Sequence, residues 1–299
     1  MNKKPSAYFC NLAIDEITKT VKKGLDKCGL YYRIFARCKS DDSTCRKLAA
    51  KPYSRETGYL MQDYFGIRVA LYFHDDIPIC KEIIKKHFQV VGESITKHDS
   101  KTFSPVILNL VCNIPEDTLS LIDSNLWSDF PFDQTFEIQI RTIFSEGWHE
   151  IDHDIRYKCK EDWAQHQDLD RNLNGILATL ETCDWSMVAL INDLAYREYK
   201  SRQWPEMLKN KLRIHLSDSS LCAAVLRLFD DDNDLAKSIY RFDRQELLVY
   251  LSGLKSKIPL TANNIVFLIN YLFIHNVEIE KITPTALYSI LGVTSTVSE

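Results

Sequence analysis

An alternating segment, Thr135–Arg141 (TFEIQIR), carries the first group of residues whose types and spacing suit chemistry. Successive side chains of a strand point to opposite faces. A strand here therefore places Glu137, Gln139 and Arg141 in one polar row and sends the hydrophobic residues into a core. Taken alone, such a row is also typical of an ordinary solvent-facing sheet surface.

A second carboxylate lies just before another hydrophobic segment. Asp63 precedes Tyr64–Phe73, which reads as a buried strand from which Arg68 projects. Carboxylates from a strand edge and from a neighbouring strand can share one Mg²⁺, which prefers oxygen ligands and keeps several waters. Asp63 and Glu137 are therefore the candidate metal ligands and the candidate catalytic residues.

A basic cluster supplies a candidate phosphate site. Ser43 and Lys47 are one helical turn apart and share a face, while Arg37 and Lys39 come from the segment that leads into this helix. Cations that converge at a helix N-terminus can hold a triphosphate through their side chains. The nine glycines are never clustered, which excludes a P-loop and a Rossmann fingerprint. A basic amphipathic helix is the alternative interpretation.

Together, these segments resemble the synthetase domain of the RelA/SpoT alarmone synthetases and of their small single-domain relatives. The resemblance lies in the order and spacing of four motifs, which are RxKxxxSxxxK from Arg37, DxxGIR from Asp63, FEIQIRT from Phe136 and WxExxHxxxYK from Trp148. It covers about residues 20–165, about half of the chain.

The resemblance implies an ATP site. In the family, arginines that match Arg37 and Arg68 sandwich the adenine of ATP, a cation–π arrangement. Residues that match Lys39, Ser43 and Lys47 hold the phosphates.

The resemblance also implies the reaction, in which a ribose 3′ oxygen attacks the β-phosphorus of ATP and AMP leaves. The carboxylates that match Asp63 and Glu137 serve Mg²⁺, and Glu137 is also the expected base for the acceptor hydroxyl. Gln139 and Arg141 then support the acceptor side. Such phosphoryl transfer depends mostly on positioning and charge neutralisation.

The acceptor is where this sequence departs from the family. The family's acceptor loop reads YxSxH, and its tyrosine stacks on guanine, whereas this chain has KTFSPVILNLVCNIP. Phe103 or no residue replaces the tyrosine, and Asn109 is expected near the histidine position. Guanine nucleotides, adenine nucleotides and the 3′ end of tRNA, which toxin-like relatives modify, all remain possible acceptors. A degenerate module that only senses a nucleotide is an alternative, although a sensor has no use for both carboxylates.

The segment His149–His153 (HEIDH) offers a rival, because it matches the HExxH pattern of zinc proteases. Two histidines one turn apart can chelate zinc, with Glu150 as the base. No further ligand motif follows, however, and the synthetase pattern already accounts for Glu150 and His153 as supporting residues.

The pattern of hydrophobic residues predicts an α+β fold, with a mixed sheet of about five strands covered by helices as in nucleotidyltransferase-like synthetases, followed by an all-α region. We predict a synthetase domain over residues 1–202, including a long helix at 168–200, and a helical bundle over 203–299 with a possible oligomeric or regulatory role. The predicted strands are 31–36, 64–73, 89–95, 106–114 and 135–141, and the other predicted helices of the first domain are 6–28, 41–50, 77–88 and 143–158.

The composition agrees with a globular, cytoplasmic protein. Apolar residues make up 45% of the chain, and no segment is apolar enough for a membrane helix or a signal peptide. The nine cysteines are scattered, without a CxxC pair, and are expected to be free thiols. Basic residues predominate in the first 55 residues and acidic ones in the remainder, which favours a local anion site.

Overall fold

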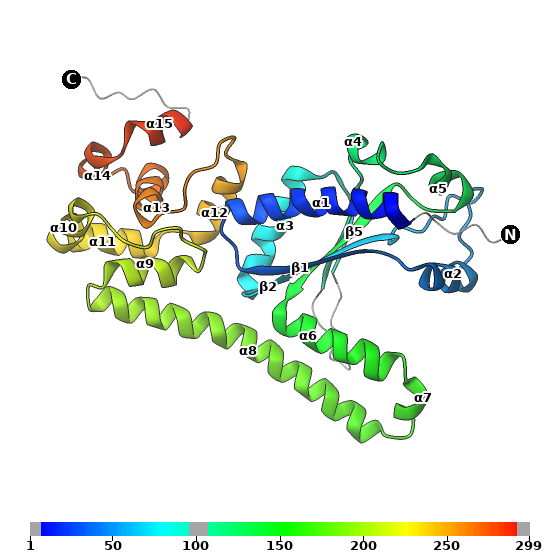
Figure 1. Cartoon of the computed structure of the whole chain (residues 1–299). Coiled ribbons are helices and arrows are strands. Elements are labelled where there is room, and N and C mark those ends of the chain that lie inside the picture. Colours follow the sequence, from blue (N-terminus) through cyan, green and yellow to red (C-terminus); the bar gives the residue numbers. More distant parts are fainter. Residues whose placement is uncertain (1–6, 96–106, 292–299) are drawn as a thin grey trace. The chain divides into compact units, whose positions relative to one another are not determined.

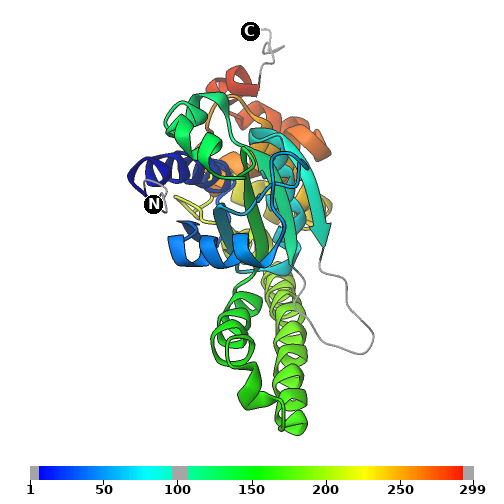
Figure 2. The same ribbon diagram turned by 90° about the vertical axis from the view of Figure 1, so that its right-hand side faces the viewer.

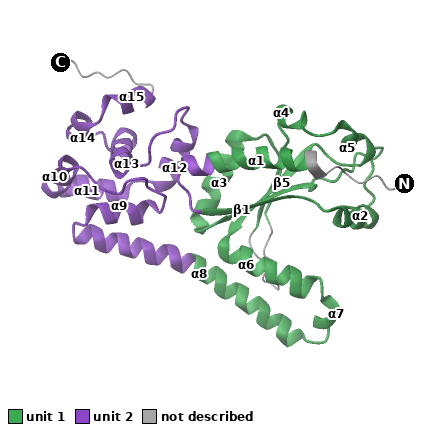
Figure 3. Ribbon diagram, in the orientation of Figure 1, with its two compact units in different colours: residues 1–23, 32–184 green, residues 24–31, 185–299 purple. Residues whose placement is uncertain are grey.

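The computed structural model describes residues 7–95 and 107–291. These residues form two compact units (Figure 3), of which the first comprises residues 1–23 and 32–184 and the second residues 24–31 and 185–299. Helix α8 (Gln167–Lys200) runs without a break through the division between them. The predicted boundary between residues 202 and 203 stays a prediction.

The first unit is built on a five-stranded sheet with the order β1-β2-β5-β4-β3 (Figure 1). Strands β2 and β5 are parallel, and the other three pairings are antiparallel. This confirms the predicted mixed sheet of five strands. The strands are β1 (Tyr32–Cys38), β2 (Phe65–Leu71), β3 (Val90–Ile95), β4 (Leu108–Asn113) and β5 (Thr135–Thr142).

One face of this sheet is apolar because alternate residues of the three central strands are hydrophobic. Phe136 of this face meets Phe88 edge-on, with the ring centroids 5.0 Å apart. Removing such side chains from water is the main stabilising contribution to the fold. The buried residues of this face include Phe65, Ile67, Val69, Leu71, Leu108, Leu110, Cys112, Phe136, Ile138 and Ile140.

The opposite face of the sheet is polar, and the register of the strands sets its side chains in rows. In one row, Arg37 of β1 pairs with Gly66 of β2, which pairs with Glu137 of β5. The next row brings Arg68 beside Gln139. Asn109 of β4 continues that row on the far side of Gln139.

Helices surround this sheet, and most agree with the predicted ranges. Helix α6 and the first half of α8 lie side by side (Figures 1 and 2), and the Trp148 indole donates to the Leu173 carbonyl over 3.3 Å. The helices of this unit, besides α8, are α1 (Ala7–Lys27), α2 (Asp41–Ala50), η1 (His74–Asp76), α3 (Ile77–His87), α4 (Glu116–Leu119), α5 (Ser124–Asp129), α6 (Ile143–Ile151), η2 (Asp152–Tyr157) and α7 (Lys160–Trp163).

The single helix predicted over residues 143–158 is wrong in one respect. It is α-helical only to Ile151, and η2 continues it as a π-helix. The wider turn coincides with a set of tertiary contacts made by Arg156, which pairs with Asp152 and also donates to Asp170 and Asn174. These contacts connect η2 to the start of α8, information that periodicity along the chain does not contain.

The second unit is helical, as predicted, and its described residues form only an isolated bridge between Asp218 and Thr261. Pro205 lies in the first turn of α9, where its missing N–H costs no hydrogen bond. The core contains the apolar residues Leu208, Leu212, Leu221, Val225, Leu247, Leu251, Ile265 and Leu268. Besides α8, the helices are α9 (Trp204–Leu212), α10 (Ala223–Asp231), α11 (Asn233–Arg241), α12 (Arg244–Gly253), α13 (Ala262–Ile269), η3 (Asn270–Ile274), α14 (Val277–Ile282) and α15 (Thr285–Leu291).

Two observations concern the whole described part of the chain. None of its helices combines the length and the apolar character that crossing a membrane requires. All nine cysteines are free thiols, as predicted.

Helix α1 ends in a Schellman motif at Gly29. The Gly29 N–H donates to Asp26 and the Leu30 N–H donates to Leu25, which satisfies two terminal carbonyls. Gly29 has φ +67°, and a Cβ built on it would lie 2.8 Å from Leu260 Cδ1 and 3.0 Å from the His215 carbonyl oxygen. Both the backbone conformation and the packing therefore require glycine.

We predict that Gly29→Ala destabilises the protein by about 2–4 kcal/mol, because it adds a clash to the cost of a left-handed alanine. Gly58→Ala is the matched control, since Gly58 has φ +69° but no heavy atom within 4 Å of an added Cβ. It should cost only about 1 kcal/mol. Urea unfolding of both variants measures the difference, and equal losses would contradict this account.

Candidate active site

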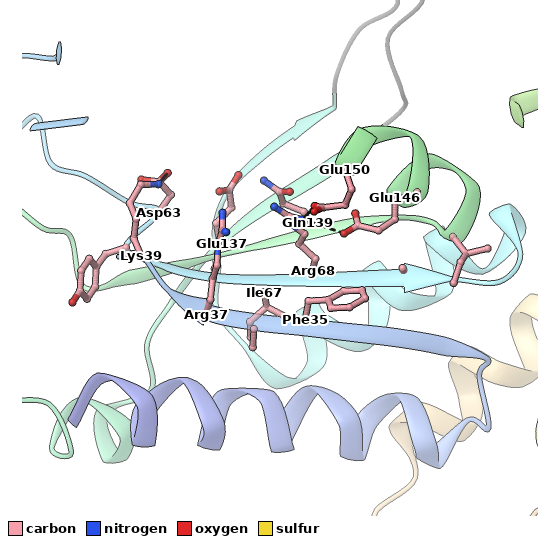
Figure 4. Close-up of a pocket in the computed structure, with 16 residues that line it drawn as sticks. Phe35, Arg37, Lys39, Asp63, Ile67, Arg68, Glu137, Gln139, Glu146 and Glu150 are labelled. Atoms are coloured by element: carbon pink, nitrogen blue, oxygen red, sulfur yellow. Dashed lines mark hydrogen bonds and ion pairs between the residues drawn. The ribbon is translucent and has the colours of Figure 1, made fainter. Parts of the chain in front are cut away.

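A cavity of about 500 Å³ opens over the polar face of the sheet (Figure 4), and we call it the arginine cavity. Asp63 and Lys39 lie at one end, Arg68 lies at the other, and Glu137 lies between the two ends. Helix α1 lies on the opposite side of the sheet from Glu137 and Arg68. The lining consists of Phe35, Ala36, Arg37, Lys39, Asp63, Tyr64, Gly66, Ile67, Arg68, Ala70, Glu137, Gln139, Ile143, Glu146, Gly147 and Glu150.

A second hollow of about 380 Å³, which we call the tyrosine cavity, adjoins the same carboxylates. Asp63 and Glu137 line both cavities, so the two candidate ligands form their common wall. The other residues of the tyrosine cavity are Lys47, Lys51, Tyr53, Tyr59, Leu60, Gln62 and Val111. The two carboxylates predicted as metal ligands therefore border the same two cavities.

Asp63 is the meeting point of the basic cluster. Its Oδ2 accepts hydrogen bonds from Lys39 Nζ at 2.8 Å and from Lys47 Nζ at 2.6 Å. Burial of the Asp63 carboxyl favours its neutral form, but the two ammonium groups outweigh this effect and hold its pKa below the usual value. Burial opposes the charge on Lys47 too, and the bond to Asp63 nevertheless raises the pKa of Lys47.

Two other charged residues of the arginine cavity have no such partners. Within the described part of the chain, neither Arg37 nor Glu137 makes a side-chain hydrogen bond or an ion pair. Gly66 lies between them in the register of the sheet, and a Cβ there would approach only the Arg37 carbonyl oxygen, at 4.0 Å. The floor between this cation and this carboxylate is therefore open.

The donor atoms of this site suit a magnesium ion. Asp63 Oδ1 is buried and has no hydrogen-bond partner, and the Glu137 carboxylate is unpaired among the described residues. Two carboxylates with free oxygen atoms match the preference of Mg²⁺ for oxygen ligands. No group of three or more His, Cys, Asp and Glu residues in the described ranges is arranged to hold a metal.

A chain of ion pairs and one hydrogen bond lies at the other end of the arginine cavity. Arg68 Nη1 donates to Glu146 Oε1 at 3.1 Å and also to Glu150. The second Glu146 oxygen lies 3.0 Å from Arg141 Nη1, and Arg141 Nη2 donates to Gln139. Gln139 in turn is the neighbour of Arg68 across the strands, so the first and last residues of this chain of contacts lie side by side in the sheet.

Arg141 is the member of this network that most needs a counter-ion, because its charged side chain is fully buried. Its Nε and Nη1 have no partner with hydrogen-bond geometry, so the approach of Nη1 to Glu146 is an ion pair without a well-formed hydrogen bond. Burial lowers the pKa of Arg141, and the charge of Glu146 opposes that effect. Glu146 is therefore the principal counter-ion of a buried guanidinium.

The predicted phosphate residues divide between the two cavities. Lys39 lines the arginine cavity and Lys47 the tyrosine cavity, while both contact Asp63. Ser43 lines neither cavity, and its backbone N–H donates to Ser40, which caps α2. Arg37 lines the arginine cavity.

The predicted supporting residues are also dispersed. Glu150 lines the arginine cavity, whereas His153 lies outside both cavities and bonds to Asp154. Burial, followed by the charges of Arg141 and Arg68, lowers the pKa of His149 to about 4. Asn109 lies beside Gln139, and its Oδ1 is buried without a partner.

The expectation for Phe103 falls outside the described residues. The zinc-protease alternative needs His149 and His153 as metal ligands and Glu150 as the base. In the structure, the Glu150 carboxylate pairs with Arg68 instead.

Sequence reasoning missed several residues of the site. Glu146 lies one turn before Glu150, and only the position of α6 against β2 shows its role. Tyr53 and Tyr59 lie in the connection between α2 and β2, where no periodicity marks them. The sequence signal that could have marked Tyr53 and Tyr59 is the presence of two aromatic residues shortly after Lys51.

The lowered pKa of Asp63 implies a pH-dependent contribution to stability. A group whose pKa is lower in the folded state stabilises the fold above its unfolded pKa of about 3.9, and that stabilisation is lost as the pH falls through the folded value. We therefore expect Asp63→Asn to cost about 1–2 kcal/mol at pH 6. The difference from the wild type should shrink towards pH 3. Urea unfolding across this range tests it, and a constant difference would contradict it.

The buried network predicts unequal roles for the two acids that contact Arg68. Glu146→Gln should cost about 3 kcal/mol, because it leaves Arg141 buried without its counter-ion. Glu150→Gln should cost less than about 1 kcal/mol, since the Glu150 side chain is 51% exposed. Equal losses in urea unfolding would show that Arg141 does not depend on Glu146.

Comparison with known proteins agrees with this geometry. The family model described as the region found in RelA / SpoT proteins matches residues 36–162. The GTP pyrophosphokinase YjbM of Bacillus subtilis (strain 168) is 34% identical over 102 residues, which are 33% of this chain and 43% of that protein. The chain thus spans less than half the length of this curated relative.

Solved structures with a similar arrangement are small alarmone synthetases. Small alarmone synthetase 2 from Bacillus subtilis has a TM-score of 0.49 and 22% identity, over 62% of this chain and 93% of that one. Small alarmone synthetase 1 from the same organism, bound to its product pppGpp, has a TM-score of 0.48 and 22% identity over the same shares.

The matched region contains Arg37, Asp63, Arg68 and Glu137, together with the acids of α6. Residues 36–162 therefore match the region found in RelA / SpoT proteins, and part of the chain is similar to a GTP pyrophosphokinase.

Proposed function

We propose that this protein is a Mg²⁺-dependent pyrophosphotransferase, which moves the β,γ-pyrophosphate of ATP to the 3′ hydroxyl of a nucleotide or of a tRNA end. The observation that carries the proposal is that Glu137 and Asp63 line both cavities, where Glu137 pairs with none of the residues that the structure describes and Asp63 is held by two lysines. One carboxylate is free to accept a proton, and cations lie where phosphates need neutralising.

The donor fits the arginine cavity. Arg37 and Arg68 project from adjacent strands on the same face and are one row apart, so a planar base between them contacts both guanidinium groups. The chain of phosphates then runs towards Lys39 and Asp63 at the other end of the cavity. A volume of about 500 Å³ lies within the common range of small-molecule sites.

The phosphates of ATP compete with Asp63 for its lysines. Without substrate, both Lys39 and Lys47 are neutralised by one carboxylate. A triphosphate offers these ammonium groups stronger acceptors, and Asp63 can then direct its oxygens to a divalent cation. Magnesium bound to Asp63 and Glu137 would supply charge neutralisation at the phosphates and help to orient them.

Glu137 is placed for the proton transfer. In the proposed step, the acceptor hydroxyl oxygen forms a bond to the β-phosphorus of ATP as the bond from that phosphorus to the α,β-bridging oxygen breaks. AMP departs with the bridging oxygen, and the hydroxyl proton passes to a Glu137 carboxylate oxygen. Arg37 lies across Gly66 from Glu137, on the side from which the donor approaches.

We expect labelled pyrophosphate to move from γ-labelled ATP to one member of a panel of GDP, GTP, ADP, AMP and bulk tRNA, with AMP as the second product. Chelation of magnesium by EDTA should stop the transfer. Label that appears only in inorganic phosphate, or AMP that forms without a labelled acceptor, would refute the proposed reaction.

We expect Glu137→Gln to lower kcat about 10²- to 10⁴-fold while calorimetry still detects binding of a non-hydrolysable ATP analogue. Asp63→Asn should lower kcat and also raise the magnesium concentration needed for half-maximal rate. Glu116→Gln, which removes an exposed acid of α4 outside both cavities, is the matched control and should retain the wild-type rate. Full activity of Glu137→Gln would remove this residue as the base.

A further inference from the structure

Helix α6 begins at a buried side-chain junction that lies outside both cavities. We infer that Asp184 of α8 is a positioning residue for the donor, because it holds the hydroxyl of Thr142 that caps α6 and thereby fixes the place of Arg68. This inference rests on the proposed function and adds to it a residue that lines neither cavity. The family-model match ends at residue 162 and therefore includes neither α8 nor Asp184.

The Thr142 hydroxyl joins two helices of the first unit through its two roles. It donates to Asp184 Oδ2 at 2.7 Å and accepts from the Ser145 backbone N–H at 3.2 Å. A hydroxyl has only one proton to donate, so the bond to Asp184 limits where its lone pairs point. Thr142 and Asp184 are only 4% and 7% exposed, so little water competes for these bonds. Asp184 therefore orients the group that caps α6.

The cap lies next to both members of the buried ion pair. Arg141 directly precedes Thr142 in the chain, and Glu146 directly follows Ser145. The bond between Ser145 and Thr142 therefore closes the turn that brings Glu146 to within 3.0 Å of Arg141. Because no residue separates the capping groups from the paired ones, a change in the geometry of the cap moves the ion pair with it.

The position of Arg68 depends on α6. Both acids that pair with its guanidinium group, Glu146 and Glu150, come from that helix. In the proposed function, Arg68 forms one side of the sandwich around the donor base, so a displaced α6 would open the sandwich. Asp63 and Glu137 make no hydrogen bond or ion pair with α6 in the described part of the chain. We therefore expect donor affinity to depend on Asp184 more than the rate of the chemical step does.

The surroundings of Asp184 do not favour an acid. Leu177 and Val188, which follow the same buried stripe of α8, are apolar. Burial raises the pKa of the Asp184 carboxyl, and the hydrogen bond from Thr142 opposes that effect. An apolar side chain would fill this position without the cost of burying a charge. The distinct contribution of the carboxylate is therefore its bond to Thr142.

The test measures donor affinity separately from the rate. Asp184→Ala should raise the KM for ATP and the dissociation constant of a non-hydrolysable ATP analogue about tenfold, with kcat within about threefold of the wild type. Asp184→Asn should restore both constants to within about threefold, because its amide oxygen can still accept from Thr142. A variant that is only less stable behaves differently, since a smaller folded fraction lowers the apparent kcat and leaves KM unchanged.

Asp193→Ala is the matched control on the same helix. The Asp193 side chain is 51% exposed and pairs with Arg197, one turn further along α8. This variant should change neither the KM for ATP nor kcat. An equal rise of KM in Asp193→Ala and Asp184→Ala would overturn the inference.

Changes at Thr142 supply the test if Asp184→Ala does not fold. Thr142→Ser keeps the hydroxyl and should bind the analogue within about twofold of the wild type. Thr142→Val has nearly the same shape without the hydroxyl and should bind it about tenfold more weakly. Equal affinities of these two variants would overturn the inference.

A double-mutant cycle tests whether Asp184 acts through Arg68. In the Arg68→Ala background, Asp184→Ala should change the dissociation constant of the analogue by less than about twofold, because the residue that it positions is gone. A further tenfold loss of affinity in that background would overturn the inference.

Binding of the analogue requires no turnover, which keeps this inference distinct from the proposed function. If the wild type binds the analogue but transfers no label, and Asp184→Ala binds it about tenfold more weakly, the reaction fails and the positioning role stands. If transfer proceeds and Asp184→Ala has the affinity of the wild type, the positioning role fails alone. A wild type that binds no analogue overturns both.

Discussion

The parallel pairing of β2 with β5 is the constraint on which the site depends. It sets Gly66 beside Glu137 and Arg68 beside Gln139, and these contacts join segments about seventy residues apart in the sequence. A shift of the register by one residue would turn Glu137 and Gln139 into the apolar core. The buried residues Ile67 and Ile138 pair with each other on the other face and oppose any such shift.

Electrostatics gives the two ends of the arginine cavity different characters. At one end, a single carboxylate is shared by Lys39 and Lys47, so substrate anions can replace an existing partner. At the other end, Arg141 is fully buried and depends on Glu146. The Asp63 end therefore suits an exchange of ionic partners. The Arg141 end holds Arg68 in a fixed position, because breaking a buried ion pair is costly.

Much of this structure could be predicted from the sequence, because the relevant signals are local. Alternation in TFEIQIRT predicts both the strand and the polar row, and the motif order around Arg37 and Asp63 predicts which segments meet. What remained hidden depends on tertiary packing. The role of Glu146 exists only through the approach of α6 to β2, and the stacked pair of Tyr53 and Tyr59 lies beside a bridge between Ser54 and Tyr59.

The end of the predicted helix at residue 158 illustrates the same limit. Hydrophobic periodicity continues through His149–Lys158, yet the backbone changes to a π-helix where Arg156 reaches α8. Side-chain contacts between distant segments decide such local geometry, and a pattern along one segment does not record them. The Asp63 carboxylate is similar, since its lysine partners come from two separate elements.

At Gly66, the fold and the proposed function place different requirements on the side chain. Its backbone needs no left-handed conformation, and an added methyl group would meet nothing closer than 4.0 Å. An alanine there would therefore keep the sheet intact while its methyl group occupies the floor between Arg37 and Glu137. A screen that scores only expression or thermal stability would accept such a change, whereas natural selection acting on turnover would reject it.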